Sequence, residues 1–161
     1  MNTGIYSTSI LFIIAATLSN NTLAQKAADI QRETKPLILR SIMAELGNNM
    51  QAITHAINIE DWAQVSASAE LIAEHPQPPM TERIRILSFV GSNISQFKEH
   101  DEKTHQAAKV LSETAKDNKG FQIINAFSKL QQTCLSCHQK FRHKFKQHFY
   151  PDTSVSVKLN N

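Results

Sequence analysis

The chain has 161 residues, a formal net charge of +3 at pH 7 and 41% hydrophobic residues. So small a charge predicts no nucleic-acid or other polyanionic partner, because such partners are held by a strong excess of lysine and arginine. The length suits one domain with a buried core and excludes a second domain of ordinary size.

The first 24 residues are predicted to form a signal peptide. Ser9 to Leu18 is an apolar run that is too short to span a bilayer comfortably, and Thr22-Leu23-Ala24 offers a small-residue cleavage site. We therefore expect cleavage after Ala24, export, and no membrane span in the mature chain. Because residues 1–8 contain no lysine or arginine, an uncleaved anchor stays open as an alternative.

The sequence between the leader and the C-terminal tail predicts an all-α protein. Glycine and proline are scarce, with 4 and 5 copies, and the long segments between them show helical rather than alternating periodicity. A first helix is expected over residues 36–56, where apolar residues recur at steps of three and four. This apolar face comprises Leu39, Ile42, Met43, Leu46, Met50, Ile53 and Ile57.

Two further helices are expected on either side of a long connection. The second helix begins at the capping residue Asp61 and ends near His75. Residues 76–79 contain three prolines and cannot continue it, so they begin the connection, which holds one short helix over residues 82–90. The third helix is expected over residues 92–117.

A fourth helix is expected over residues 121–147. Its inward face is predicted to carry Phe121, Ile124, Leu130, Cys134, His138, Phe141 and Phe145. The polar residues 151–161 are expected to be disordered. The predicted organisation is therefore a signal peptide over residues 1–24, a four-helix domain over residues 25–150 and a disordered tail.

The most informative motif is Cys134-Leu135-Ser136-Cys137-His138, the attachment signature of a c-type haem. Two cysteines one helical turn apart can each form a thioether to a haem vinyl group, which places the next side chain under the iron. The motif predicts one covalently bound haem c with His138 as the proximal iron ligand. Two alternatives stay open: a dithiol redox pair, and a zinc site completed by His143 and His148.

Basic residues follow this motif closely. Lys140, Arg142, Lys144 and Lys146 form a positive cluster in a chain whose total charge is small. The cluster is interpreted either as a docking surface for an acidic redox partner or as a solvated helix face near the haem propionates.

Four helices, a long connection between the second and third, and an attachment motif near the C-terminus resemble the cytochrome c-prime family. The resemblance is closest to its low-spin cytochrome c556 branch and covers essentially the whole mature chain. It implies a four-helix bundle around the haem. Arg142, four residues past the haem histidine, is implied to lie beside the haem and pair with a propionate; the alternative is a surface arginine.

The resemblance also implies a sixth iron ligand. The segment from Arg40 to Met50 is similar to the c556 version, including Gly47, and this similarity assigns the sixth position to Met43. The family arginine stands one position closer to the methionine here, and Met43 could instead fill the core. His55 and His105 are the alternative sixth ligands, and the remaining histidines give no positional reason for ligation.

The functional expectation is a periplasmic electron carrier that works with redox partner proteins through an iron held by His138 and Met43. The alternative is a five-coordinate protein that binds or buffers nitric oxide or carbon monoxide. No enzymatic activity is expected, because only Arg40 offers an acid-base group near Met43. The resemblance implies a homodimer through the first two helices, but their outer faces show no decisive apolar patch, so the oligomeric state stays open.

Overall fold

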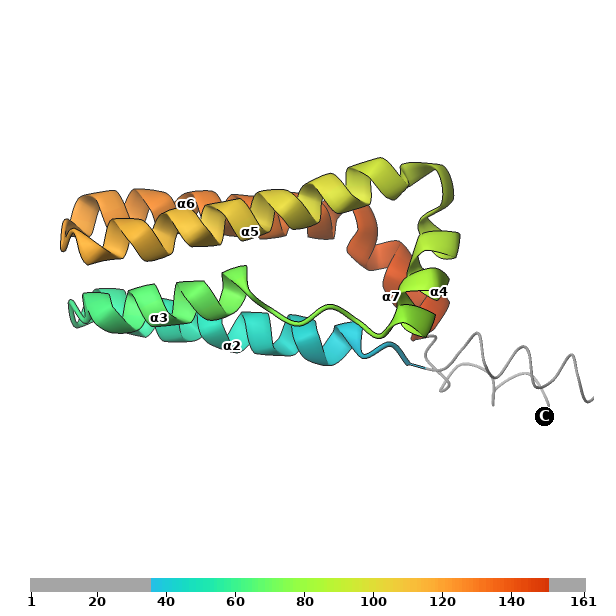
Figure 1. Cartoon of the computed structure of the whole chain (residues 1–161), viewed down its shortest axis with the longest axis horizontal. Coiled ribbons are helices and arrows are strands. Elements are labelled where there is room, and N and C mark those ends of the chain that lie inside the picture. The colour runs from blue at the N-terminus through green and yellow to red at the C-terminus, as the bar shows by residue number, and fades with distance from the viewer. Residues whose placement is uncertain (1–35, 151–161) are drawn as a thin grey trace, which may run out of the picture. The chain divides into compact units, whose positions relative to one another are not determined.

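The computed structural model describes residues 36–150 as an all-α four-helix bundle, which confirms the predicted fold class (Figure 1). The predicted signal peptide and the predicted disordered tail lie outside these residues. No described residue belongs to a strand. None of the helices within residues 36–150 is long and apolar enough to cross a bilayer.

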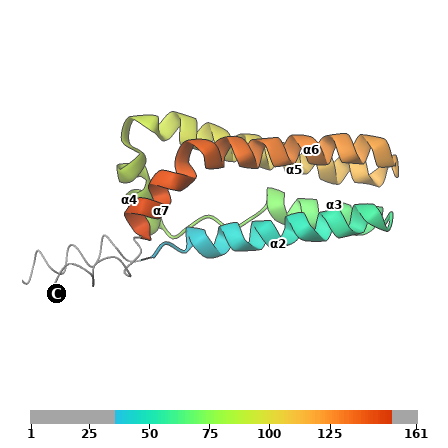
Figure 2. The same cartoon turned by 180° about the vertical axis from the view of Figure 1, so that it is seen from behind.

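Four long helices make up the bundle. α3 packs against α2 and α5, and α5 packs against α6, whereas α2 and α6 make little direct contact. Figures 1 and 2 show α2 and α3 in one layer and α5 and α6 in the other. The bounds are α2 Leu39–Asn58, α3 Trp62–Ala73, α5 Ile94–Lys116 and α6 Gly120–Cys137.

The long connection between α3 and α5 also has the predicted form. It holds one helix, α4 Met80–Val90, followed by the short 3₁₀ turn η1 Gly91–Asn93. α4 starts two residues earlier than predicted, directly after Pro79, because a proline is excluded from a helix interior but not from its start. The connection thus carries the chain to the far end of the bundle (Figure 1).

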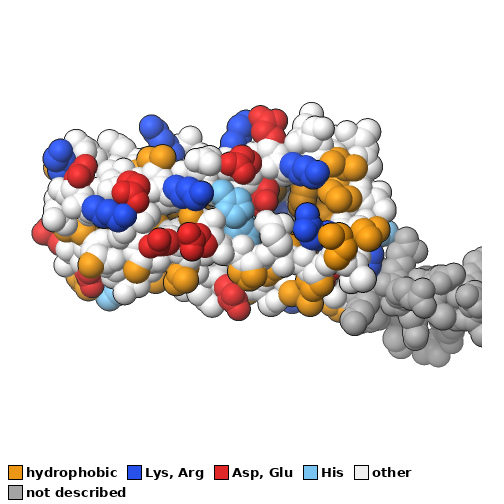
Figure 3. All heavy atoms as spheres, viewed as in Figure 1, with side chains coloured by type: hydrophobic (Ala, Val, Ile, Leu, Met, Phe, Trp, Pro, Cys, Tyr) orange, Lys and Arg blue, Asp and Glu red, His pale blue; other side chains and the backbone are white. Residues whose placement is uncertain are grey.

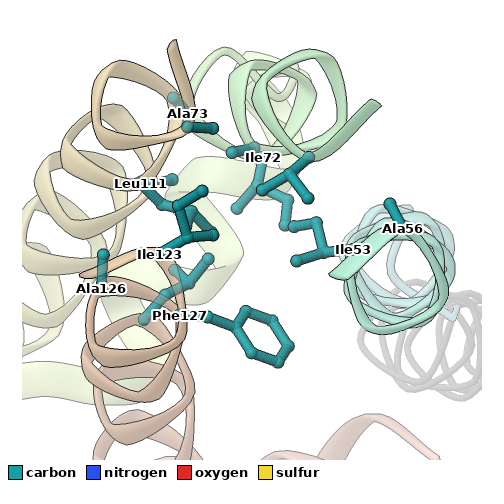
Figure 4. Close-up of a cluster of buried hydrophobic side chains, with 13 residues drawn as sticks. Ile53, Ala56, Ile72, Ala73, Leu111, Ile123, Ala126 and Phe127 are labelled. Atoms are coloured by element: carbon teal, nitrogen blue, oxygen red, sulfur yellow. The ribbon is translucent and has the colours of Figure 1, made fainter. Parts of the chain in front are cut away.

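Two apolar clusters hold the helices together. The first, called here the bundle core, gathers side chains from all four long helices (Figure 4). The second, called the aromatic cluster, joins α4 to the C-terminal helix through edge and stacked ring contacts of Phe89. The bundle core consists of Ile53, Ala56, Val65, Ala69, Ile72, Ala73, Ala108, Leu111, Ala115, Ile123, Ala126, Phe127 and Leu130. The aromatic cluster consists of Leu37, Ile86, Val90, Phe141, Phe145 and Phe149, with Phe89 and Phe97 packed against them.

The inward face of the fourth helix differs from the prediction. Phe121 is 87% exposed and Ile124 is 47% exposed, so their assignment to the core is wrong. His138, predicted on the same face, is also exposed. The side chains that do face inward are Ile123, Phe127, Leu130, Cys134, Cys137, Phe141, Phe145 and Phe149.

A π-helical turn explains the register of the inward face beyond Cys137. The long C-terminal helix consists of α6, the π-helical turn η2 His138–Arg142 and α7 His143–Phe149. Successive steps of four residues drift by about 40° each in a regular α-helix. A π-helical turn contains one residue more than an α-helical turn. Residues spaced four positions apart can therefore stay on the inward side of the helix beyond residue 137. The widened turn therefore begins at the histidine of the motif.

The start of α2 is held by hydrogen bonds to residues that are far away in the sequence. Its N-cap residue, Ile38, supplies no side-chain cap. Instead the buried Glu82 of α4 accepts the backbone N–H of Ile38 at 2.7 Å and that of Leu39 at 2.8 Å. The Tyr150 hydroxyl donates to the Leu37 carbonyl at 3.2 Å. These contacts fasten the N-terminal end of α2 to both α4 and the end of the C-terminal helix.

Candidate functional site

The two cysteines lie in the last turn of α6, at the seam between the two apolar clusters. Cys134 packs against the bundle core, and Cys137 packs against the aromatic cluster. Both are half-buried and free of any disulfide. Because they stand three residues apart on one helix, their side chains share its inward face. The structure thus places both thiols of the predicted motif along the interior of the bundle.

The electrostatics keep these thiols protonated. Burial raises the pKa of Cys134, and it raises the pKa of Cys137 to about 11, with smaller contributions from the negative charge of Asp101 and from Cys134. Redox dithiols have the opposite setting, at a helix N-terminus with a lowered pKa. The setting therefore does not favour the dithiol alternative.

His138 begins the π-helical turn directly after Cys137 and is exposed. Partial desolvation lowers the pKa of its imidazole, and the Arg142 guanidinium lowers it further. A neutral imidazole is the form that binds a metal, because it keeps a lone pair on one ring nitrogen. The surroundings of His138 therefore favour its ligand form.

Arg142 ends the same turn and is exposed. Its charge acts on His138, four residues earlier. Among residues 36–150 the ion pairs found do not include Arg142. The other members of the predicted basic cluster, Lys140, Lys144 and Lys146, are exposed as well.

Met43 lies on α2, on the same side of that helix as Gly47 one turn later. Its side chain is 39% exposed and belongs to neither apolar cluster, although the sequence pattern predicts it on the apolar face. A methyl group built on Gly47 would meet nothing within 4 Å. The space beside Gly47 is therefore open.

The zinc alternative finds little support in the positions of its proposed ligands. His143 is exposed, and the His148 ring stacks on Phe89 with centroids 4.4 Å apart. In the part of the chain that the structure describes, one group of metal-ligating side chains comes together, and it contains neither cysteine. That group is His75, Asp101 and His105.

The sequence pattern predicts no role for His75 and suggests His105 only as a haem ligand. The two histidines are 30 positions apart: His75 lies in the connection just after α3, and His105 lies on α5. No local spacing signals such a group, because it forms only when the end of α3 packs on the middle of α5.

The donor set fits a covalently attached haem. Two half-buried thiols on one helix face, followed directly by a histidine, are the donors that such a group requires of the chain. Comparison of the chain with models of protein families, with curated proteins and with solved structures finds no match.

Proposed function

We propose that the protein is a c-type cytochrome that transfers electrons through one haem c. Cys134 and Cys137 hold the haem through two thioethers, His138 is the proximal iron ligand and Met43 is the sixth. The observation that carries the proposal is the position of the attachment motif, whose two half-buried cysteines line the seam between the apolar clusters. The resemblance to the cytochrome c-prime family, closest to its c556 branch, points the same way.

The chain's own residues would attach the haem, orient it and shield it from water. Because burial raises the pKa of both thiols, each would supply an S–H group for thioether formation with a haem vinyl group. Phe97 and Phe141, whose rings meet edge to face at 5.3 Å, line the neighbouring interior and exclude water from it. Arg142 is available to pair with a propionate. When bound, the haem supplies a one-electron couple, and methionine ligation raises its potential.

The exposed basic cluster supports docking to an acidic redox partner, because complementary charge speeds encounter between proteins. The proposal places this encounter in the periplasm, which rests on the predicted leader at residues 1–24. It assigns no catalytic residue.

A second candidate function is supported by the surroundings of Met43. Its side chain is 39% exposed and is not held by either apolar cluster. Without such packing Met43 is free to line a pocket and leave the sixth iron position open. The protein would then bind nitric oxide or carbon monoxide instead of transferring electrons.

Mass spectrometry of the exported protein tests attachment first. We expect the mass of a chain cleaved after Ala24 plus one haem, and loss of the covalent haem in the Cys134→Ser/Cys137→Ser variant. A chain that carries no haem when it is coexpressed with a cytochrome c maturation system would refute the proposal.

Optical and EPR spectra then read the sixth position. Low-spin ferric iron with a thioether-to-iron band that Met43→Ala abolishes would support electron transfer. Met80→Ala is the matched control, because Met80 lies on α4 and is 64% exposed. High-spin iron that binds carbon monoxide readily and does not respond to Met43→Ala would instead establish the gas-binding function.

A further inference from the structure

The group formed by His75, Asp101 and His105 lies where α3 ends against the middle of α5. Asp101 and His105 are one turn apart on α5, and His75 follows the last turn of α3. The two imidazoles stack with their centroids 4.6 Å apart and their planes at 16°. One ligand atom from each of the three side chains lies within 4.8 Å of the other two.

Backbone contacts fix which ring nitrogens are available. His75 Nδ1 lies 3.1 Å from the Ile72 carbonyl, and His105 Nδ1 contacts the Ala73 carbonyl. A carbonyl only accepts, so both Nδ1 atoms carry the proton and donate it, and each neutral ring keeps its lone pair on Nε2. Metal-binding histidines commonly donate their other nitrogen to a carbonyl in this way, which fixes both tautomer and orientation.

Both Nε2 atoms face the carboxylate. His75 Nε2 is 3.9 Å from Asp101 Oδ1, and His105 Nε2 is 3.7 Å from Asp101 Oδ2. These separations are too long for hydrogen bonds. Ligand atoms around a tetrahedral zinc ion lie about 3.3 Å apart, given bond lengths of about 2.0–2.1 Å. Side-chain shifts of a few tenths of an ångström would bring each imidazole–carboxylate pair to this spacing.

The burial of the two imidazoles and the negative charge of Asp101 also favour binding of a cation. The side chains of His75 and His105 are 7% and 17% exposed, whereas that of Asp101 is 43% exposed and opens to solvent. Histidine surface is visible beside acidic side chains where the end of α3 meets α5 (Figure 3). A divalent ion would satisfy both lone pairs and the carboxylate together.

We propose that His75, Asp101 and His105 bind a divalent transition-metal ion, zinc above all. The two Nε2 atoms and the carboxylate of Asp101, whose Oδ1 faces His75 and whose Oδ2 faces His105, supply the protein ligands, and the rest of the coordination shell opens to water. The site does not depend on the proposed haem, because none of its ligands belongs to the attachment motif.

Zinc titration of the full mature protein by calorimetry tests the site. Reactive thiols are counted and alkylated beforehand, because free Cys134 and Cys137 would bind zinc themselves. A chain with reactive thiols contradicts the haem proposal without affecting this one, so the two failures are distinguishable. We expect one zinc ion per chain.

Matched variants separate the ligands from the backbone contacts. In His75→Asn and His105→Asn the amide nitrogen can still donate to the α3 carbonyls while the Nε2 ligand is lost. Each should weaken zinc binding more than about tenfold, since loss of even an outer-shell partner costs about 10–100-fold. If a histidine variant fails to fold, Asp101→Asn tests the same loss of zinc affinity, because the Asp101 side chain is half-exposed. His55→Asn, at an exposed histidine of α2, should change affinity less than twofold.

X-ray absorption at the zinc edge identifies the ligands directly. We expect nitrogen and oxygen neighbours at about 2.0–2.1 Å and no sulfur at about 2.3 Å. Sulfur neighbours, absence of stoichiometric binding, or equal zinc affinities in the wild type and all three ligand variants would overturn the proposal.

Discussion

Glu82 is the residue whose removal tests the architecture around α2 most sharply. Glu82 is 6% exposed, and its carboxylate accepts the backbone N–H of the N-cap residue Ile38 at 2.7 Å and that of Leu39, the first residue of α2, at 2.8 Å. Hydrogen bonds to a charged group contribute about 1.5–3 kcal/mol each. In Glu82→Gln the amide can accept only one of the two N–H groups and turns its own NH₂ toward the other.

We therefore expect Glu82→Gln to lower the free energy of unfolding by about 2–3 kcal/mol, from one lost charge-assisted bond and the lost charge at a helix N-terminus. For a domain of this size that loss corresponds to a fall in Tm of about 7–11 °C. Urea unfolding followed by circular dichroism measures it, with both proteins in the same haem state. Glu45→Gln, at an exposed position of α2, is the control and should change stability by less than about 0.5 kcal/mol.

Hydrogen exchange adds a local measurement. The amides of Ile38 and Leu39 should exchange faster in Glu82→Gln, while those in the middle of α2 should change only with global stability. Equal stabilities of Glu82→Gln and Glu45→Gln, with unchanged exchange at these two amides, would refute the claim that Glu82 caps the helix. The same result would mean that Glu82 does not hold the start of α2, which lies four residues before Met43.

Three further predictions concern the interior. Ile123→Ala should lower the free energy of unfolding by about 2–5 kcal/mol and Ile124→Ala by less than about 1 kcal/mol, as measured in urea, because only Ile123 is fully buried. In a chain made without haem, burial raises the pKa of Cys137 from 9.0 to about 11, so its alkylation at pH 8 should be about 100-fold slower than that of a thiol with the ordinary pKa. Between pH 9 and pH 11 the Cys137 thiol keeps its proton in the folded chain and loses it in the unfolded chain. The free energy of unfolding should therefore fall as the pH rises through this range. Gly47→Ala should stabilise the haem-free chain by up to about 1 kcal/mol, since a methyl group there meets nothing within 4 Å. A smaller gain in the Tm of the haem-bound protein would show that the cofactor takes this space.

The number, order and type of helices could be predicted because they follow from local signals. Asp61 caps α3 with its side chain, accepting the Gln64 N–H at 3.0 Å, and the prolines at 76–79 end that helix where expected. The inward face of the fourth helix could not be predicted as reliably. At 100° per residue Ile123 lies within about 20° of Leu130 around the helix, whereas Phe121 lies about 180° away. The prediction of Phe121 and Ile124 as inward residues therefore departs from the regular period, which the observed face through Ile123 and Phe127 follows. Its continuation depends on a π-helical turn that no local residue pattern announces.

The same distinction separates the two candidate sites. The haem motif is contiguous, so its residue types and their spacing are enough to indicate its chemistry. The histidine–aspartate group depends on tertiary packing: the last carbonyls of α3 lack helical partners, and imidazoles from two segments satisfy them. That contact alone explains the two histidines as caps, but it does not require both Nε2 atoms to face one carboxylate. Zinc affinity in His75→Asn, which keeps the cap and loses the ligand, therefore decides between a helix terminus and a metal site.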